Sequence, residues 1–410
     1  MATPQPIDDR SDEAFPQAAA AVMTELTTAL TAVVEACEGV PGARPIDISR
    51  GLGIDMKLAW KASHLVNAAS PFDAVRHIPG AAGVRILLEA AAARGCPNDV
   101  VERADHAFEA VRSFISRRAG SRRAFESMVA GIEGARDRRL EQEHRRLLFD
   151  GASSVWGMRA DLLYRFDVLF PSSISGLLDC VTVRSMVGAR RLRGGVVLPF
   201  PRPRIIDDRG QETRIVLDEP LDPAVKAGEL PLLGDFCEGP VPPFKLRRIG
   251  DAAIHEAAAA EAADVMPFTV TTGEVLRAVQ PTRVTEDTHG IFQLMRLRMP
   301  AERAIFDVLV HDDLLEPGVE PDVYLSSDLH GTAQGVGDVR RVRMPVSIRC
   351  ESLPTDSATE VEGFGRLDGL VDRAMVIAGA RLEHFRWFRI DLAYPPITST
   401  IAFECEQPSG

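Results

Sequence analysis

The chain has 410 residues, of which 45% are apolar and 26% are charged, as in an ordinary folded protein with room for two or three domains. Its formal net charge of −12 argues against a protein that coats nucleic acid without specificity, but leaves room for a local basic surface. No apolar run is long enough to span a bilayer, and the acidic, polar start does not read as a secretory signal. We therefore expect no membrane partner.

The six cysteines are widely spaced and form no C-x-x-C pair. We therefore expect neither a zinc site nor a disulfide framework, and reduced thiols indicate a cytoplasmic protein.

Residues 1–12 are predicted to be a disordered lead, and residues 13–150 an all-helical domain. Residues 14–37 hold many Ala, Leu, Thr and Val residues and few charges, which favours a buried or self-associating helix. Turn and capping residues then divide the chain into helices at 81–94, 98–119 and 121–149. In the last of these, Arg and Glu recur at i, i+3 and i+4, which indicates a salt-bridged, solvated surface rather than a phosphate track.

Within this domain, residues 44–66 predict two short helices joined by a glycine turn. Ile48 and Leu52 share one face of the first helix, and Gly53 suits a left-handed residue after its end. Ile54 would pin the turn into the core, and Asp55 can cap the second helix.

The second helix separates into two faces. Leu58, Ala62 and Leu65 would pack inward, with Ala59 and Val66 beside them. The outward stripe would consist of Lys57, Trp60, Lys61 and His64. Lysines neutralise phosphates and long polar side chains reach base edges, so this stripe suits a duplex groove, with Arg50 on a phosphate.

This segment resembles the helix-turn-helix regulators of bacteria. That family has a small residue in the first helix, Gly in the turn four residues later and an apolar residue six positions further on, where this chain has Ser49, Gly53 and Ala59. The resemblance is confined to residues 44–66 and implies double-stranded DNA as a partner. The alternative is an ordinary helical hairpin in which Trp60 packs under a neighbour.

Residues 159–410 predict a mostly antiparallel α+β domain. The expected strands are 162–170, 180–187, 195–200, 268–271, 291–299, 305–310, 323–326 and 342–350, followed by a strand pair at 385–393 and 398–404. Helices are expected at 255–265 and 360–380. Residues 201–250 hold many Pro and Gly residues and predict a long loop or arm. A short echo links residues 166–171 to residues 306–310, both beginning Phe-Asp-Val-Leu.

The sequence offers few residues for catalysis. Five residues could converge on one ion if adjacent strand ends brought them together, namely His311, Asp312, Asp313, Asp328 and His330, but polar turns explain them more simply. The Gly-rich segment 331–337 lacks the Gly-Lys-Ser/Thr ending of a phosphate-binding loop and predicts a hairpin loop. We therefore predict no enzyme, no cofactor and no metal site.

Two functions fit these observations. The first is a DNA-binding transcriptional regulator, a dimer whose α+β domain senses a small-molecule effector or mediates self-association, with Arg50, Lys57, Trp60, Lys61 and His64 contacting DNA. The second is a structural protein that assembles into a large homo-oligomer, with the arm at 201–250 lying across a neighbour and the helix-turn-helix serving as scaffold.

Overall fold

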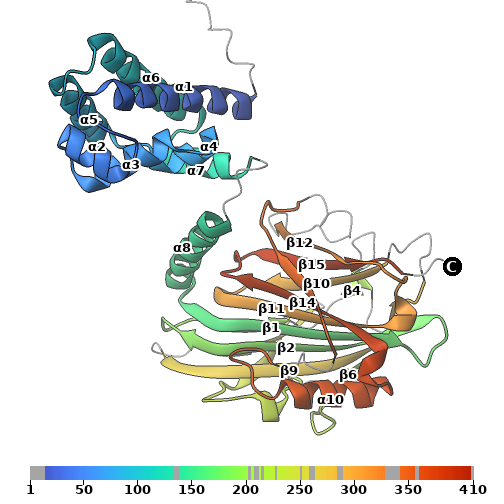
Figure 1. Ribbon diagram of the computed structural model, residues 1–410. Coiled ribbons are helices and arrows are strands. Elements are labelled where there is room, and N and C mark those ends of the chain that lie inside the picture. The colour runs from blue at the N-terminus through green and yellow to red at the C-terminus, as the bar shows by residue number, and fades with distance from the viewer. Residues whose placement is uncertain are drawn as a thin grey trace, which may run out of the picture. The chain divides into compact units, whose positions relative to one another are not determined.

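The computed structural model describes residues 14–132, 138–201, 205–206, 212–213, 217–226, 229–249, 252–257, 264–283, 290–327, 342–355 and 360–407 (Figure 1). The chain divides into two compact units, Met1–Asp137 and Arg138–Gly410. The first holds helices and the second combines sheets with helices, which confirms the predicted order of a helical region followed by a mostly antiparallel α+β region. The boundary groups α8 with the sheets rather than with the preceding helices.

The helical unit is described from α1 to α7. Its elements are α1 (Phe15–Ala36), α2 (Pro45–Leu52), α3 (Met56–Val66), α4 (Pro71–Ala74), the 3-10 helix η2 (Val75–His77), α5 (Ala81–Ala93), α6 (Asn98–Arg118) and α7 (Arg122–Ala130). Helices α1 and α6 pack along one another, and their apolar faces meet in a core that includes Met23, Leu30, Phe108 and Val111.

Helix α1 is long and apolar enough to cross a membrane, judged by length and composition alone. Seven of its side chains are buried within the helical unit. A core helix of a bundle has the same composition, so this feature does not distinguish the two roles.

The predicted helix at 121–149 is not continuous. Ser121 caps α7 by accepting from the N–H of Ala124, and α7 ends at Ala130, where Gly131 follows. The next described helix is α8 (Arg138–Trp156). Glycine has low helix propensity, and Gly131 and Gly134 fall together in the middle of the predicted helix.

The second unit is built on a seven-stranded sheet with the order β13-β14-β11-β1-β2-β9-β6. These strands are β1 (Met158–Pro171), β2 (Leu177–Arg191), β6 (Leu217–Pro220), β9 (Asp264–Pro281), β11 (Ala301–His311), β13 (Arg349–Leu353) and β14 (Phe385–Ala393). Strands β1 and β11 are parallel, and all other strand pairs in the described residues are antiparallel.

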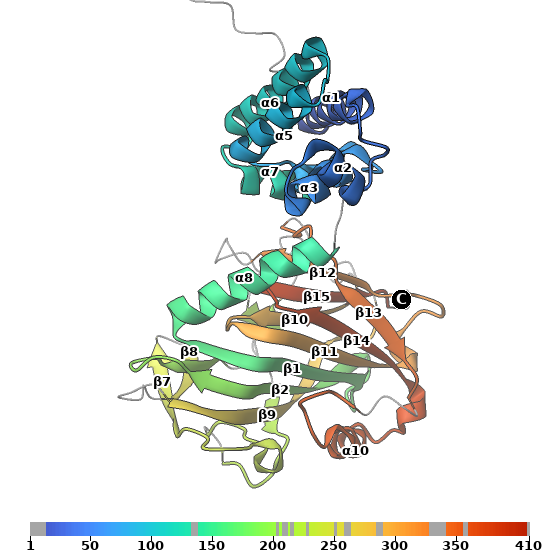
Figure 2. The same ribbon diagram turned by 60° about the vertical axis from the view of Figure 1, so that its left-hand side comes forward.

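The two faces of this sheet are covered differently (Figure 1 and Figure 2). One face packs on a three-stranded sheet of β10 (Ile291–Leu297), β15 (Ser399–Cys405) and β12 (Asp322–Ser327), with Phe306, Phe388 and Phe403 in the core between them. The other face packs on α10 (Leu367–Ala378), with Tyr164, Phe166 and Trp387 against Leu370 and Val371.

The remaining described elements are short. They are β3 (Leu198–Pro201), β7 (Phe244–Ile249) and β8 (Ala252–Ala257), which form a sheet of their own, the pair β4 (Ile205–Ile206) and β5 (Glu212–Thr213), and the 3-10 helices η3 (Gly234–Phe236), η4 (Asp312–Leu314) and η5 (Leu382–His384).

The predicted arm at 201–250 is wrong for the part that the structure describes. Strand β6 pairs with β9, and Leu221, Leu230, Leu233 and Phe236 are buried in the same unit. Buried leucines explain this packing, because they remove apolar surface from water that an extended arm would expose.

The predicted helix at 255–265 is also wrong. Its first residues belong to β8, which pairs with β3 on one side and β7 on the other. Residues 258–263 lie outside the described residues, and β9 begins at Asp264. Pairing with the distant strand β3 and with β7, which directly precedes β8 in the chain, overrides the helix propensity of alanine.

Three other elements differ in extent or partner. The predicted helix at 360–380 begins only at Leu367, after a turn in which Arg366 adopts φ = 66°. The strand predicted at 342–350 occurs as β13, at Arg349–Leu353. The predicted strand pair at 385–393 and 398–404 separates into two sheets, because the proline-containing turn at 394–398 sends β15 between β10 and β12.

Candidate nucleic-acid interface

A glycine turn joins α2 to α3. Gly53 has φ = 72°, a left-handed conformation that glycine adopts without strain, and its N–H donates to the carbonyl of Ser49. The hydroxyl of Ser49 donates to the carbonyl of Ile54 at 2.8 Å. The Asp55 carboxylate caps α3 by accepting from the N–H of Lys57 at 2.8 Å. Gly53 and Asp55 thus have the conformations and contacts that the sequence predicts.

One face of α3 is sealed against the helical unit. Its buried residues are Ala59, Ala62, Ser63 and Leu65, while Leu58 and Val66 are half-buried. The Ser63 hydroxyl donates to the carbonyl of Ala43 at 2.6 Å, which satisfies the one polar side chain on this face. The inward face therefore matches the predicted one, with Ser63 as an addition.

The predicted DNA-facing residues of α3 lie on the opposite face of that helix, and Arg50 lies on α2. Arg50, Lys57 and Trp60 are exposed, and Lys61 and His64 are half-buried. Trp60 exposes 44% of its surface, so its indole does not lie under a neighbouring element. Within the described part of the chain, neither Lys57 nor Lys61 forms an ion pair, so both ammonium groups are available to a ligand.

Three rings form a cluster beside these lysines. The ring centroids of Trp60 and His64 are 3.9 Å apart, and His77 from η2 lies 5.1 Å from Trp60 and 4.8 Å from His64. The Nδ1 atom of His64 lies 2.8 Å from the carbonyl oxygen of Trp60. The sequence prediction missed His77, since no periodicity joins a residue of η2 to the face of α3.

Cations surround His77. Burial is the main cause that lowers its pKa from 6.5 to about 4, and electrostatic interaction with His64, Arg76, Lys61 and Arg122 lowers it further. Arg122 reaches this position from α7, where its guanidinium donates to backbone carbonyls at the end of η2 and pairs with Glu126. Positive potential therefore extends from α3 to η2 and α7.

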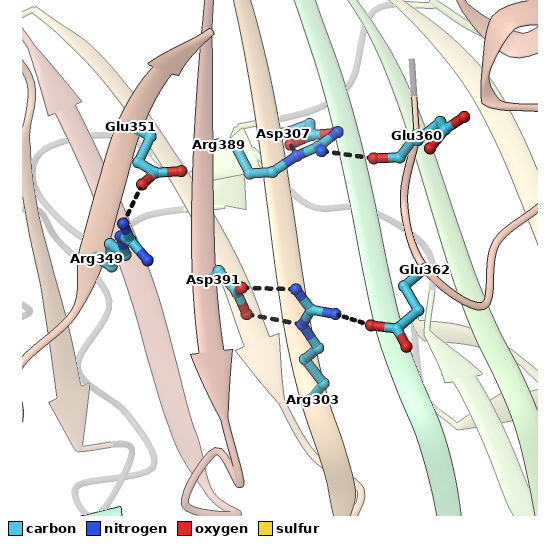
Figure 3. A network of polar contacts seen from close by, with 8 residues as sticks. All are labelled: Arg303, Asp307, Arg349, Glu351, Glu360, Glu362, Arg389 and Asp391. Atoms are coloured by element: carbon cyan, nitrogen blue, oxygen red, sulfur yellow. Dashed lines mark hydrogen bonds and ion pairs between the residues drawn. The ribbon is translucent and has the colours of Figure 1, made fainter. Parts of the chain in front are cut away.

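A second group of charged residues lies on the α10 face of the sheet (Figure 3). Arg389 forms a bidentate ion pair with the Asp307 carboxylate, with hydrogen bonds of 2.8 and 2.7 Å, and also donates to the carbonyl of Glu360. Arg303 forms a second bidentate ion pair, in which its Nε and Nη2 atoms donate to the two carboxylate oxygens of Asp391 at 3.0 and 2.7 Å. Asp307 is fully buried, so this pairing keeps a charged carboxylate inside the protein.

The opposite face of the sheet also holds a buried aspartate that is paired with an arginine. Asp167 is fully buried and pairs with Arg165 at 2.7 Å. Asp167 and Asp307 occupy the two echoed segments, on the neighbouring parallel strands β1 and β11. The strand register places Phe166 opposite Asp307 and Asp167 opposite Val308. It is therefore shifted by one residue from the sequence alignment of the two segments, in which Asp167 matches Asp307. The two aspartates therefore point to opposite faces and cannot act as a catalytic pair.

The residues considered for a metal site lie in a turn. His311 is the last residue of β11, and Asp312 and Asp313 begin η4, where the Nδ1 of His311 accepts from the N–H of Asp313. In the described residues no group of three His, Cys, Asp or Glu side chains could hold a metal ion. The predictions for Asp328, His330 and the loop 331–337 lie outside the described residues.

No family model matches this chain, and no curated protein or solved structure matches it either. The likeness of residues 44–66 to the bacterial helix-turn-helix regulators therefore rests on their sequence and local geometry alone.

Proposed function

We propose that the protein is a cytoplasmic DNA-binding regulator whose helices α2 and α3 act as a helix-turn-helix. The observation that carries this proposal is the outward face of α3, on which Lys57, Trp60, Lys61 and His64 are at least partly exposed while the opposite face is buried. A recognition helix needs this division, because it must pack on its own domain and insert into the major groove at once.

The local charge supports the same proposal. Between residues 44 and 94 the chain has seven basic and four acidic residues, although the whole chain carries −12. Arg50 stands exposed on α2, where it is free to contact the phosphate backbone. Binding to the phosphates supplies affinity, and base-edge contacts from α3 supply specificity.

In this proposal the sheet unit binds a small-molecule effector or mediates self-association. A dimer would present two copies of α3, and two half-sites one helical turn apart would then multiply a modest single-site affinity.

The test compares two double variants of the full chain. Lysine occurs at only four positions, Lys57, Lys61, Lys226 and Lys245, and the last two are exposed in the sheet unit. Affinity for a mixed-sequence DNA duplex of ~30 bp, about three helical turns, is measured against salt concentration by fluorescence anisotropy. We expect Lys57→Ala with Lys61→Ala to reduce the slope of log affinity against log salt by roughly two.

The matched control is Lys226→Ala with Lys245→Ala, which removes the same net charge from the sheet unit and should leave the slope unchanged. Equal effects of the two double variants would contradict the proposal, as would the absence of duplex binding at low salt by folded protein. A particle far larger than a tetramer would instead favour the structural homo-oligomer.

A further inference from the structure

Helix α8 is fixed to the sheet unit along one side (Figure 2). Phe149 is buried, and its ring lies 5.7 Å from that of Tyr394. Arg145 donates to the carbonyl of Ala393, and the guanidinium of Arg159 lies 5.6 Å from the centre of the Phe149 ring. These contacts hold α8 in one orientation, so the residues that face away from them are set by the fold.

The other side of α8 carries a stripe of exposed apolar residues. Leu147, Leu148 and Val155 expose 54%, 47% and 75% of their surfaces, with Gly151 exposed between them. Leu148, Gly151 and Val155 are three, four and seven residues apart, and Leu147 lies four residues before Gly151, so the four share one broad face of the helix. We call these four residues the α8 stripe.

Such a stripe is unusual within this unit. The other large exposed apolar residues described in the sheet unit outside α8 stand singly on their elements, and they are Ile174, Val197, Leu246, Met266 and Val376. Single exposed apolar residues need no explanation, but neighbouring ones on a rigid helix indicate a surface that becomes covered.

The charges beside the stripe indicate what covers it. Arg139, Glu143, Arg146 and Asp150 follow one another along the edge of the stripe at intervals of four, three and four residues, and all four are exposed. Their signs alternate. In an antiparallel pair of α8 helices centred between Leu147 and Leu148, the Arg146 of each helix lies next to the Asp150 of the other. The same register sets Leu147 against Leu148.

We propose that the α8 stripe and its charged edge bind the same surface of a second copy of this chain, with the two α8 helices antiparallel. A two-fold contact of this kind uses each residue twice, so a modest surface is sufficient for a dimer. The charged edge is complementary to itself in this register, and the leucines meet leucines, which a surface for an unrelated partner need not provide. The dimer does not depend on DNA binding by α3.

The experiment measures the mass of the full chain by sedimentation equilibrium at micromolar concentrations. We expect a dimer, and we expect Leu148→Glu to raise its dissociation constant by about 30-fold or more, since the change buries a charge twice at the centre of the contact. The matched control is Val376→Glu, which adds the same charge at an exposed position of α10 and should leave the mass unchanged.

A charge exchange makes the test specific for the antiparallel register. Arg146→Glu alone places two acids together and should weaken the dimer, while Arg146→Glu combined with Asp150→Arg should restore it. Unfolding curves of each variant show whether the fold is intact. A monomeric parent chain, a dimer unaffected by Leu148→Glu, or a double exchange without rescue would each overturn the proposal.

If the parent chain is monomeric and Leu148→Glu lowers its unfolding midpoint, another segment of the same chain covers the stripe. The variants also separate this inference from the proposed function. Leu148→Glu should not change affinity for a duplex too short for two half-sites, and the Lys57→Ala, Lys61→Ala variant should keep the parent mass.

Discussion

The two units of this protein place their charged side chains in opposite ways. The sheet unit buries Asp167, Asp179, Glu274 and Asp307, each in an ion pair with an arginine. In the described residues of the helical unit, Ser63 is the only buried polar side chain. The ion pairs Arg44–Asp47, Arg85–Glu89, Arg112–Glu109 and Arg122–Glu126 of this unit join residues three or four apart in sequence. The arginines that pair with these four buried acids are therefore committed to the fold, whereas the lysines of α3 remain open to a ligand.

The strongest test of this difference removes an arginine from the sheet. Arg389→Met leaves Asp307 buried without its cation, and Arg389 is the main group that opposes the rise in the pKa of Asp307 caused by burial. We expect a loss of about 3–5 kcal/mol in the free energy of unfolding, measured in urea. The control is Arg381→Met, whose partner Glu383 is exposed, and which should cost less than about 1 kcal/mol.

A second variant shows whether the loss comes from the orphaned charge. Asp307→Asn combined with Arg389→Met removes both charges, and the amide oxygen introduced at position 307 can still accept the hydrogen bond that Tyr164 donates at 2.9 Å to the native carboxylate. This double variant should recover most of the stability that Arg389→Met loses. A loss below about 1 kcal/mol for Arg389→Met would contradict the role assigned to the ion pair.

The helical unit should instead be sensitive to small changes in volume. A Cβ added at Gly51 of α2 would lie 2.7 Å from the carbonyl oxygen of Gly39 and 2.5 Å from the side chain of Val40. Since the backbone has to move, we expect Gly51→Ala to cost about 1–3 kcal/mol in the free energy of unfolding. Gly80→Ala is the matched control, because nothing lies within 4 Å of its added Cβ and a change from Gly to Ala at that helix cap should cost only about half a kcal/mol.

The Gly51 variant also bears on the proposed DNA site. If the packing of α2 sets the position of α3, Gly51→Ala should weaken duplex binding in protein that is still folded, while Gly80→Ala should not. Equal stabilities of the two glycine variants would show that α2 can shift freely. In that case the contact of Gly51 with Gly39 and Val40 would not determine the position of α3.

Much of the helical unit could be predicted from the sequence because its signals are local. A cap, a glycine and a period of 3.6 fall within one element, and α5 and α6 end within a residue of their predicted limits. Strand β14 was predicted with the bounds that it has, because its apolar pattern is strong and a proline follows.

The failures concern contacts between distant segments. Residues 255–265 were predicted to be a helix, but residues 255–257 belong to β8, which lies between β3 and β7. The echo at Asp167 and Asp307 was visible, but only the register of β1 on β11 shows that the two carboxylates face opposite ways. In the candidate site, the position of Gly53 and the outward face of α3 followed from local spacing, whereas His77 did not, since the fold alone brings η2 to α3.

The smallest effect that we expect comes from this same ring cluster and has a defined dependence on pH. Because the pKa of His77 in the folded protein, about 4, lies below the ordinary 6.5, the unfolded chain takes up this proton first as the pH falls. The stability that neutral His77 contributes is complete above about pH 6.5 and is lost as the pH falls towards 4. His77→Gln should flatten the fall of the unfolding midpoint over this window, and His106→Gln, at an exposed position of α6, should not. His77 is partly solvated, so the difference is modest. Identical pH profiles for the parent and His77→Gln would show that burial and the neighbouring cations do not lower the pKa of this imidazole.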